Sequence, residues 1–256
     1  MSFLSFGSVL RIVFFVLVLL IYSHNGLCNQ VAVSSAPLKY DPSGSNGWYP
    51  YYIDGPTPTG IAVEVVQNIL KKAKIQGQPT NLPPKRTQFA LKNGLIDFDL
   101  VNPDWLPDEE DKSYVVFSKP IFAIKEHVVY LPDQTPAENF LTENQRFKPI
   151  MGVVRGYYYH DTHLFISFEF NSEKEVIEAL KKRRVPFGIS GDLPALYWAN
   201  KLNVDIVLGP VHSDGFLHMR LRKEHQHLLP NINNAIDQLK RDGELQRIIK
   251  KYTTDL

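Results

Sequence analysis

Helix-like and strand-like patterns of apolar residues alternate along most of the chain. After a polar, aromatic loop over residues 41–60, apolar positions recur at helical spacing over residues 62–73, and Gly77 is expected to stop this helix. A second helix is predicted over residues 87–93, and it leads into an apolar strand over residues 95–101. Such alternation predicts sheets with parallel strands that helices cover.

The same pattern continues through the second half of the chain. Ser172 and Glu175 form the capping box of a helix that is predicted to continue to Lys182. Apolar positions over residues 232–239 predict a further helix, which Gly243 stops. The other expected elements are strands over 31–34, 114–117, 121–130, 150–154, 168–170, 185–190 and 204–208, a helix over 193–202 and a last short helix up to Tyr252.

The first 28 residues have the pattern of an export signal. Arg11 is the only charged side chain before residue 38, and an apolar run of 11 residues follows it. A membrane-spanning helix needs about 20 apolar residues, so this run is too short for one. Gly26 and Cys28 fill the two small-residue positions before a cut after Cys28, which would deliver the protein to the periplasm. Lipid modification of Cys28 is a less favoured alternative, because residues 25–27 match the usual preceding pattern poorly.

Composition narrows the class of protein. Hydrophobic residues make up 44% of the chain and aromatic residues 12%, which excludes a disordered chain. The 28 Lys and Arg against 27 Asp and Glu leave a net charge of +1, so no net field recruits nucleic acid or an anionic membrane. The single cysteine excludes a disulfide framework and a multi-cysteine metal site.

The sequence carries no convincing motif of a catalytic or metal centre. Neither a G-x-S-x-G elbow nor a glycine-rich phosphate loop occurs. His160, Asp161 and His163 form an H-D-x-H run, but ligands two residues apart do not share a helix face, so we interpret the run as a solvated loop. His225 and His227 are interpreted as surface residues. We therefore expect no catalytic residue, no metal and no cofactor.

Aromatic side chains are concentrated in the predicted loops at strand ends. Rings supply apolar walls with a polar handle, and a few charges fix a ligand's orientation, so this pattern indicates a cleft for a small organic molecule. The aromatic residues in these loops include Trp48, Tyr51, Trp105, Tyr157 and Tyr158, and the charged ones Arg86, Arg155 and Asp192.

Several segments are distinctive in their order and spacing. They are WYPYY (48–52), TGIAVEVVQNIL (59–70), PPKRTQFALKNGLID (83–97), FSKPI (117–121), GVVRGYYY (152–159), FGISGDLPALYW (187–198) and INNAIDQLKRDGELQRIIKKY (232–252). The last is the most specific. Together they resemble the family 3 extracellular solute-binding proteins, the periplasmic components of polar amino-acid uptake systems, over essentially the whole mature chain.

The resemblance implies an α/β fold of two lobes, of the type 2 periplasmic-binding-protein kind. Each lobe would be a mixed sheet flanked by helices, and two hinge crossovers would join them. Residues 29–122 and 216–256 would form the first lobe, and residues 123–215 the second. A small-molecule solute would bind in the cleft between the lobes, and closure about the crossovers would bury it. The implied protein is a monomer that passes its solute to an inner-membrane ABC-type permease.

The chain also departs from the family's pattern. Amino-acid binders usually carry an arginine about six residues before the Phe117-Ser118 pair, where it grips the α-carboxylate, and Asp111 holds that place here. A lysine point charge does not reproduce the fork of an arginine, so the neighbouring Lys112 is no substitute. Bulky tyrosines replace the small hydroxyl residues that usually follow Gly156. These departures argue against a standard α-amino acid as the ligand.

Nine residues are our candidates for ligand contacts. The rings would form walls, two arginines would face anionic groups in place of the missing one, and Asp192 would face a cationic group. The candidates are Trp48, Tyr51, Arg86, Asn102, Trp105, Arg155, Tyr157, Tyr158 and Asp192.

Two other functions remain open on the same fold. The protein could be a sensor subunit that presents its closed form to a membrane signalling partner. A less favoured alternative is an enzyme, since the fold also hosts a periplasmic dehydratase of cyclic acids, but that chemistry needs a positioned acid or base.

Overall fold

The computed structural model describes residues 36–42, 48–80, 82, 84–107, 112–136, 140–143 and 146–256, without the side chains of residues 84 and 85. Everything described below belongs to the unit Pro37–Leu256. The predicted export signal over residues 1–28, the predicted strand over residues 31–34 and Asp111 lie outside the described residues. Among the residues that the structure does describe, no helix is both long and apolar enough to cross a membrane.

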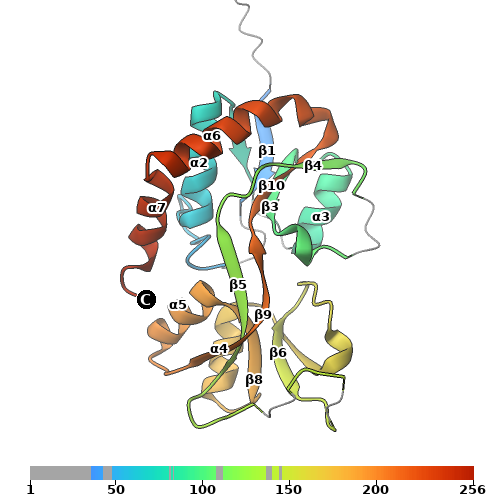
Figure 1. Ribbon diagram of the computed structural model, residues 1–256, viewed down its shortest axis with the longest axis vertical. Coiled ribbons are helices and arrows are strands. Elements are labelled where there is room, and N and C mark those ends of the chain that lie inside the picture. Colours follow the sequence, from blue (N-terminus) through green and yellow to red (C-terminus); the bar gives the residue numbers. More distant parts are fainter. Residues whose placement is uncertain are drawn as a thin grey trace, which may run out of the picture. The chain divides into compact units, whose positions relative to one another are not determined.

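The first of two sheets is built from both ends of the chain (Figure 1). Its strands, in spatial order, are β2 (Gly77–Pro79), β1 (Leu38–Asp41), β3 (Phe98–Val101), β10 (His218–Arg222) and β4 (Val115–Phe117). The strand β1 pairs in parallel with β2 and β3, whereas β10 pairs antiparallel with β3 and β4. The sheet is therefore mixed, and its one strand from the C-terminal part of the chain lies between β3 and β4.

The second sheet is formed by the middle of the chain. Its strands, in spatial order, are β7 (Ile166–Phe170), β6 (Ile150–Val154), β8 (Phe187–Gly191), β5 (Ala123–Tyr130) and β9 (Val207–Phe216). The strand β6 is parallel to β7 and β8, while β5 is antiparallel to β8 and β9. Two mixed sheets flanked by helices confirm the predicted fold class.

The chain passes between the two sheets twice, from β4 to β5 and from β9 to β10, and the two passages lie side by side (Figure 1). The strand predicted over residues 204–208 overlaps β9 only at residues 207–208, and the sequence analysis missed β10 altogether. The polar run from His212 to Gly215 interrupts the apolar alternation, so periodicity gave no sign that the strand continues to Phe216. The lobe boundaries at residues 122/123 and 215/216 remain a prediction.

Helix α2 (Ile61–Ala73) shows how the apolar pattern produces local structure. Its stripe of buried residues, which includes Ile61, Val65 and Ile69, packs in the core against helices α6 (Leu229–Arg241) and α7 (Glu244–Thr253). The prediction that Gly77 stops this helix was wrong. Lys74 ends it in the left-handed conformation with φ of 58°, and Gly77 is already the first residue of β2.

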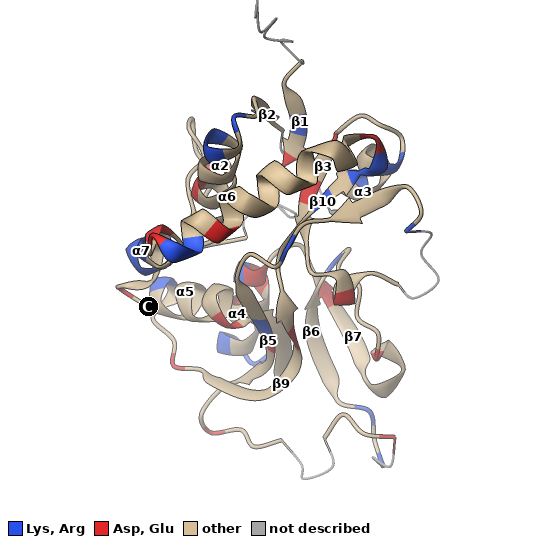
Figure 2. Ribbon diagram, turned by 45° about the horizontal axis from the view of Figure 1, so that its top comes forward, with Lys and Arg blue, Asp and Glu red and all other residues tan. Residues whose placement is uncertain are grey.

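The remaining helices follow the predicted pattern. They are α3 (Pro84–Lys92), α4 (Glu173–Lys181) and α5 (Asp192–Leu202), with short 3-10 helices η1 (Pro103–Trp105), η2 (Thr162–Leu164) and η3 (Lys223–Leu228). The Ser172 hydroxyl caps α4 by accepting the Glu175 N–H at 3.3 Å, and the Glu175 carboxylate accepts the N–H of Asn171 at 2.9 Å. The capping box is thus present, with its reciprocal bond displaced by one residue. Basic and acidic residues are interspersed along α6 and α7, in keeping with the small net charge (Figure 2).

Gly60, at the start of α2, is a position where only glycine fits. Its φ of 124° and ψ of 170° lie in a region that side chains avoid, and a Cβ there would lie 2.4 Å from the backbone oxygen of Tyr51.

We expect Gly60→Ala to lower the free energy of unfolding by about 2 kcal/mol or more, measured by urea denaturation. Gly55→Ala is the control, because its Cβ would meet nothing nearer than 3.8 Å. Equal losses in the two variants would contradict this account.

Candidate functional site

The structure holds a cavity of about 350 Å³ that residues of both sheets line. One side comes from the first sheet and the loops around it, and the other from β5, α4 and the turn that follows β6. Pockets for small organic ligands occupy about 300–1,000 Å³, so the cavity suits a molecule at the small end of this range.

Aromatic rings from loops on both sides form much of the cavity wall. Trp48 and Tyr51 are buried and stack at 4.2 Å between ring centroids, and Trp105 meets Trp48 edge-on at 6.4 Å. The Trp105 indole N–H donates to the Ser213 hydroxyl at 3.3 Å, a contact between η1 and β9. Tyr158, from the turn after β6, is 44% exposed at the cavity. Rings in this arrangement give an apolar enclosure with few polar handles.

A buried ion pair from two neighbouring strands lies at the cavity. Arg220 of β10 stands opposite Asp99 of β3, and its Nε and Nη2 donate to the two carboxylate oxygens at 3.0 and 2.6 Å. Both side chains are almost fully buried. A bidentate pair of this kind is geometrically specific, and removing one partner leaves an uncompensated buried charge. The pair therefore gives this side of the cavity a fixed polar surface.

The other side of the cavity carries two buried carboxylates. Glu173, the first residue of α4, accepts the Ser190 hydroxyl at 2.5 Å, and Glu126 of β5 accepts the Ser213 hydroxyl at 2.5 Å. Burial raises the pKa of Glu173 to about 8, and the nearby Glu126 adds to the rise. This side of the cavity is therefore acidic, with one carboxyl group that readily holds a proton.

His212 lies behind these carboxylates and links them to a loop. Its Nε2 lies 2.9 and 3.1 Å from the two Asp161 oxygens, and its Nδ1 is 3.7 Å from Glu126. Burial alone lowers the pKa of His212, but hydrogen bonds and attraction to Asp161 and Glu126 outweigh it and raise the pKa to about 9. The imidazolium form at neutral pH balances part of the negative charge.

A comparison with protein families decides the class of the chain. The model of the bacterial extracellular solute-binding proteins, family 3, matches residues 43–255. The chain belongs to this family. Its members are extracellular, and the resemblance expected from the sequence is confirmed. A comparison with curated proteins gives no match.

Solved structures similar to this solute-binding protein share its fold at low sequence identity. An arginine 3rd transport system periplasmic binding protein from Legionella pneumophila is 18% identical, with a TM-score of 0.68 and coverage of 85% of this chain and 100% of that chain. An ancestral arginine-binding protein bound to glutamine is 20% identical (TM-score 0.66; 86% and 98% covered). A histidine kinase sensor domain with similarity to periplasmic binding proteins is 15% identical (TM-score 0.71; 85% and 96% covered).

Five of the nine candidate residues lie together in the wall of the cavity. They are the aromatic ones, Trp48, Tyr51, Trp105, Tyr157 and Tyr158. The structure places both candidate arginines elsewhere. Arg155 donates to Glu169 at 3.0 Å and to Asn171 at 3.2 Å, with its side chain 58% exposed, and Arg86 lines a separate depression beside Phe89.

Asn102 and Asp192 lie next to the cavity wall rather than in it. The Asn102 side chain caps η1 by accepting the N–H of Asp104 at 3.2 Å, and it packs against Gly215 of β9. Asp192 starts α5 directly after Gly191, which does line the cavity, and burial raises the pKa of its carboxyl. Whether these four polar candidates contact a solute stays a prediction.

Sequence reasoning missed the charged groups that do line the cavity, Asp99, Arg220, Lys125, Glu126 and Glu173. The sequence does contain a signal for Asp99 and Arg220, because each is the charged residue at the centre of a short apolar segment, F-D-L and M-R-L. A charge at such a position needs a partner when it is buried. The residues of the H-D-x-H run contact different partners, since Asp161 contacts His212 whereas His163 lies 2.7 Å from Glu143.

The buried Glu173 carboxyl makes stability depend on pH in a definite direction. Its pKa in the folded protein, about 8, exceeds the ordinary value of 4.5, so the folded state keeps a proton that the unfolded state releases. The contribution of Glu173 to the free energy of unfolding is fully present below about pH 4.5 and is lost as the pH rises toward 8. Glu173→Gln removes this loss. We expect its melting temperature, relative to the wild type, to rise between pH 5 and pH 8 by at least about 2–4 °C, the equivalent of about 1 kcal/mol.

Glu169→Gln is the matched control for this experiment, because Glu169 is 54% exposed and paired with Arg155 at the surface. His212 also titrates toward pH 9, but it is present in all three proteins, so the difference between them isolates Glu173. Parallel melting curves for the wild type and Glu173→Gln across this pH range would contradict the prediction.

Proposed function

We propose that this protein binds a small, polar, amino-acid-like organic solute in the cavity and releases it unchanged to an ABC-type permease. The observation that supports this most strongly is the cavity itself, which both sheets line with aromatic rings and with buried charged groups. A binding site of this composition fixes orientation by charge and excludes water by its rings. No chemical step is proposed.

The charges of the cavity favour a solute with a positively charged group. Glu126 and Glu173 both lie on the side formed by the second sheet. Glu126 shares the positive charge of His212 with Asp161, whereas Glu173, with its pKa raised to about 8, has no such partner among the described residues. On the opposite side the negative charge of Asp99 is matched by Arg220. An ammonium or similar group beside the two glutamates would relieve the buried acidic charge. Lys125, also at the cavity, is the proposed contact for an anionic group of the solute.

We further propose that the cavity opens and closes by movement of two lobes, residues 29–122 with 216–256 and residues 123–215. Contacts across the cavity support this, because they would form on closure. Tyr49 packs against Tyr197 and Trp198 of α5 at 5.2 and 4.9 Å, and Trp105 donates to Ser213. We propose that residues 1–28 export the protein to the periplasm, in keeping with the extracellular location of the family.

A second candidate is a sensor role for the same binding event. The similarity in fold to a histidine kinase sensor domain favours it, although that protein is only 15% identical. Neighbouring genes distinguish the two functions: permease and ATPase genes indicate uptake, whereas a gene for a membrane signalling protein indicates sensing. The cavity serves both roles in the same way.

The proposed function predicts that a solute changes the environment of the cavity tryptophans. We expect native mass spectrometry to find a co-purified small molecule, and a panel of free amino acids and organic amines to give at least one compound that raises the melting temperature. The fluorescence of Trp48 and Trp105 gives the affinity. Recovery of a chemically altered compound would contradict a binding function, as would the absence of any response across the panel.

Tyr158→Ala tests the cavity wall directly. Because Tyr158 is 44% exposed, we expect the fold to tolerate its truncation. The solute loses contact with this ring, so we expect the affinity of the protein for the solute to fall at least about tenfold, or about 1.4 kcal/mol. Phe168→Ala is the control, since Phe168 is 50% exposed on β7 and is not part of the cavity. Unchanged affinity in Tyr158→Ala would remove this ring from the binding site.

A further inference from the structure

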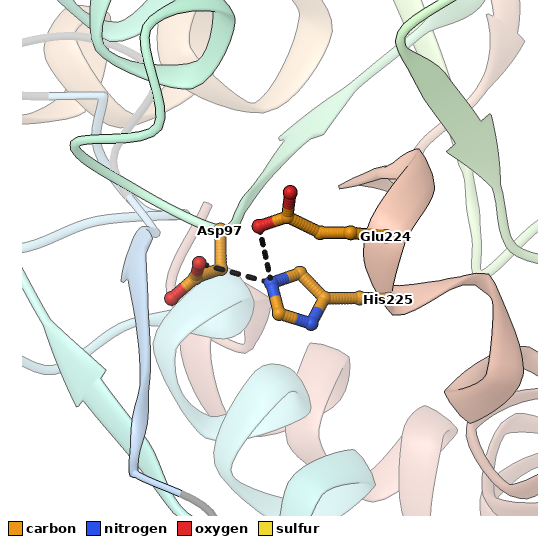
Figure 3. A group of neighbouring side chains, drawn as sticks. All are labelled: Asp97, Glu224 and His225. Atoms are coloured by element: carbon orange, nitrogen blue, oxygen red, sulfur yellow. Dashed lines mark hydrogen bonds and ion pairs between the residues drawn. The ribbon is translucent and has the colours of Figure 1, made fainter.

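Three potential metal ligands meet at the start of β3, outside the cavity wall. Asp97 directly precedes β3, and Glu224 and His225 belong to η3, which directly follows β10 (Figure 3). Within the part of the chain that the structure describes, they form the group of His, Asp and Glu side chains whose ligand atoms all lie within 4.8 Å of one another. The imidazole of His225 is oriented toward both carboxylates.

The sheet fixes the positions of these residues. Strands β3 and β10 are antiparallel neighbours, so the start of β3 and the end of β10 lie together. The N–H of Arg222 donates to the backbone oxygen of Asp97 at 2.9 Å, one bond beyond the paired strands. The side chains of His225 and Asp97 are 19% and 21% exposed. Backbone pairing of β3 with β10 thus holds the residues that carry the three side chains, as a site with defined geometry requires.

The ligand atoms lie close to the spacing of a tetrahedral site, all within 4.8 Å of one another. His225 Nε2 lies 3.0 Å from Asp97 Oδ1 and 3.5 Å from Glu224 Oε1. Zinc binds imidazole nitrogen and carboxylate oxygen at about 2.0–2.2 Å, which places neighbouring tetrahedral ligands about 3.3–3.6 Å apart. Small shifts of the side chains therefore suffice to bring all three atoms to bonding distance of one ion.

Outer hydrogen bonds leave one oxygen of each carboxylate for the ion. Asp97 Oδ2 accepts the backbone N–H of Lys39 at 2.7 Å, and Glu224 Oε2 accepts from Arg222 Nη2 at 3.0 Å. The remaining oxygen of each carboxylate is the one that faces His225 Nε2. Partners of this type orient metal-binding carboxylates in known sites.

The nitrogen at the centre of the group cannot satisfy both carboxylates with a proton. An Nε2–H donates along one direction, so it serves the oxygen at 3.0 Å well and the one at 3.5 Å poorly. A divalent cation attracts both oxygens and the ring nitrogen at once. We propose that Asp97, Glu224 and His225 bind one Zn²⁺, with water as the fourth ligand. One imidazole with two carboxylates is a ligand set that suits Zn²⁺, whereas Mg²⁺ and Ca²⁺ prefer oxygen ligands alone.

The proposed zinc site is separate from the solute cavity. None of the three proposed ligands lines the cavity, and the residue of β3 nearest to them that does, Asp99, lies two positions or about 7 Å along the strand from Asp97. Zinc binding therefore needs no solute, and the failure of either proposal leaves the other intact. Because the ion would link β3 to η3 in the folded state only, it should also stabilise the fold.

The test uses the full chain without a histidine tag, stripped with chelator and titrated with Zn²⁺ by calorimetry. We expect one Zn²⁺ per chain and a rise in melting temperature on binding. His225→Gln and Asp97→Asn should each lower the affinity at least about tenfold, with the circular dichroism spectrum used to verify folding. Glu224→Gln provides an independent variant, because Glu224 is 54% exposed and its substitution leaves the core intact.

His163→Gln is the matched control. It removes a surface histidine that lies 2.7 Å from Glu143, a histidine–carboxylate pair to which the described residues add no third ligand. We expect zinc affinity and the thermal shift to stay unchanged in this variant. The proposal is overturned if no zinc binds, or if His225→Gln, Asp97→Asn and Glu224→Gln all keep the wild-type affinity. Mg²⁺ in place of Zn²⁺ should give no comparable thermal shift.

Discussion

The pairing of the two chain passages between the sheets is the constraint on which the rest of the structure depends. Backbone hydrogen bonds join the two passages: the N–H of Ile121 donates to the carbonyl of Leu217 at 2.8 Å, and the N–H of Leu217 donates to the carbonyl of Phe122 at 2.9 Å. The ladder of β5 and β9 continues from there. This hydrogen-bonded connection joins the two sheets, and it brings residues far apart in sequence to opposite sides of one cavity.

The charges at the cavity are unequally satisfied, and this asymmetry gives the site its chemical character. Arg220 and Asp99 neutralise each other in a bidentate pair. Glu173 instead accepts the Ser190 hydroxyl, and burial raises its pKa to about 8, whereas Glu126 accepts the Ser213 hydroxyl and lies 3.7 Å from the His212 ring. A cation beside these oxygens would favour the ionised carboxylate, so binding of such a solute would be accompanied by proton release.

Periodicity predicted most of the fold but only part of the site. The buried stripe of α2 and the cap of α4 follow from local sequence, and the aromatic loops indicated the cavity wall correctly. The partnership of Asp99 with Arg220 could not be predicted without β10, because their 121-residue separation becomes contact only through strand register. Arg86 and Arg155 are close in sequence to the aromatic loops, but in the fold Arg86 lines a separate depression and Arg155 pairs with Glu169.

The same two strands connect the cavity with the proposed zinc site. In D-F-D of residues 97–99 and R-L-R of residues 220–222, the charges two apart lie on one face of each strand. The inner residues, Asp99 and Arg220, form an ion pair with each other in the buried part of the sheet. At the outer position Arg222 contacts Glu224 instead, and Asp97 is left to His225. At the end of the sheet three potential ligands therefore meet in place of a simple ion pair, because η3 supplies two further side chains where β10 ends.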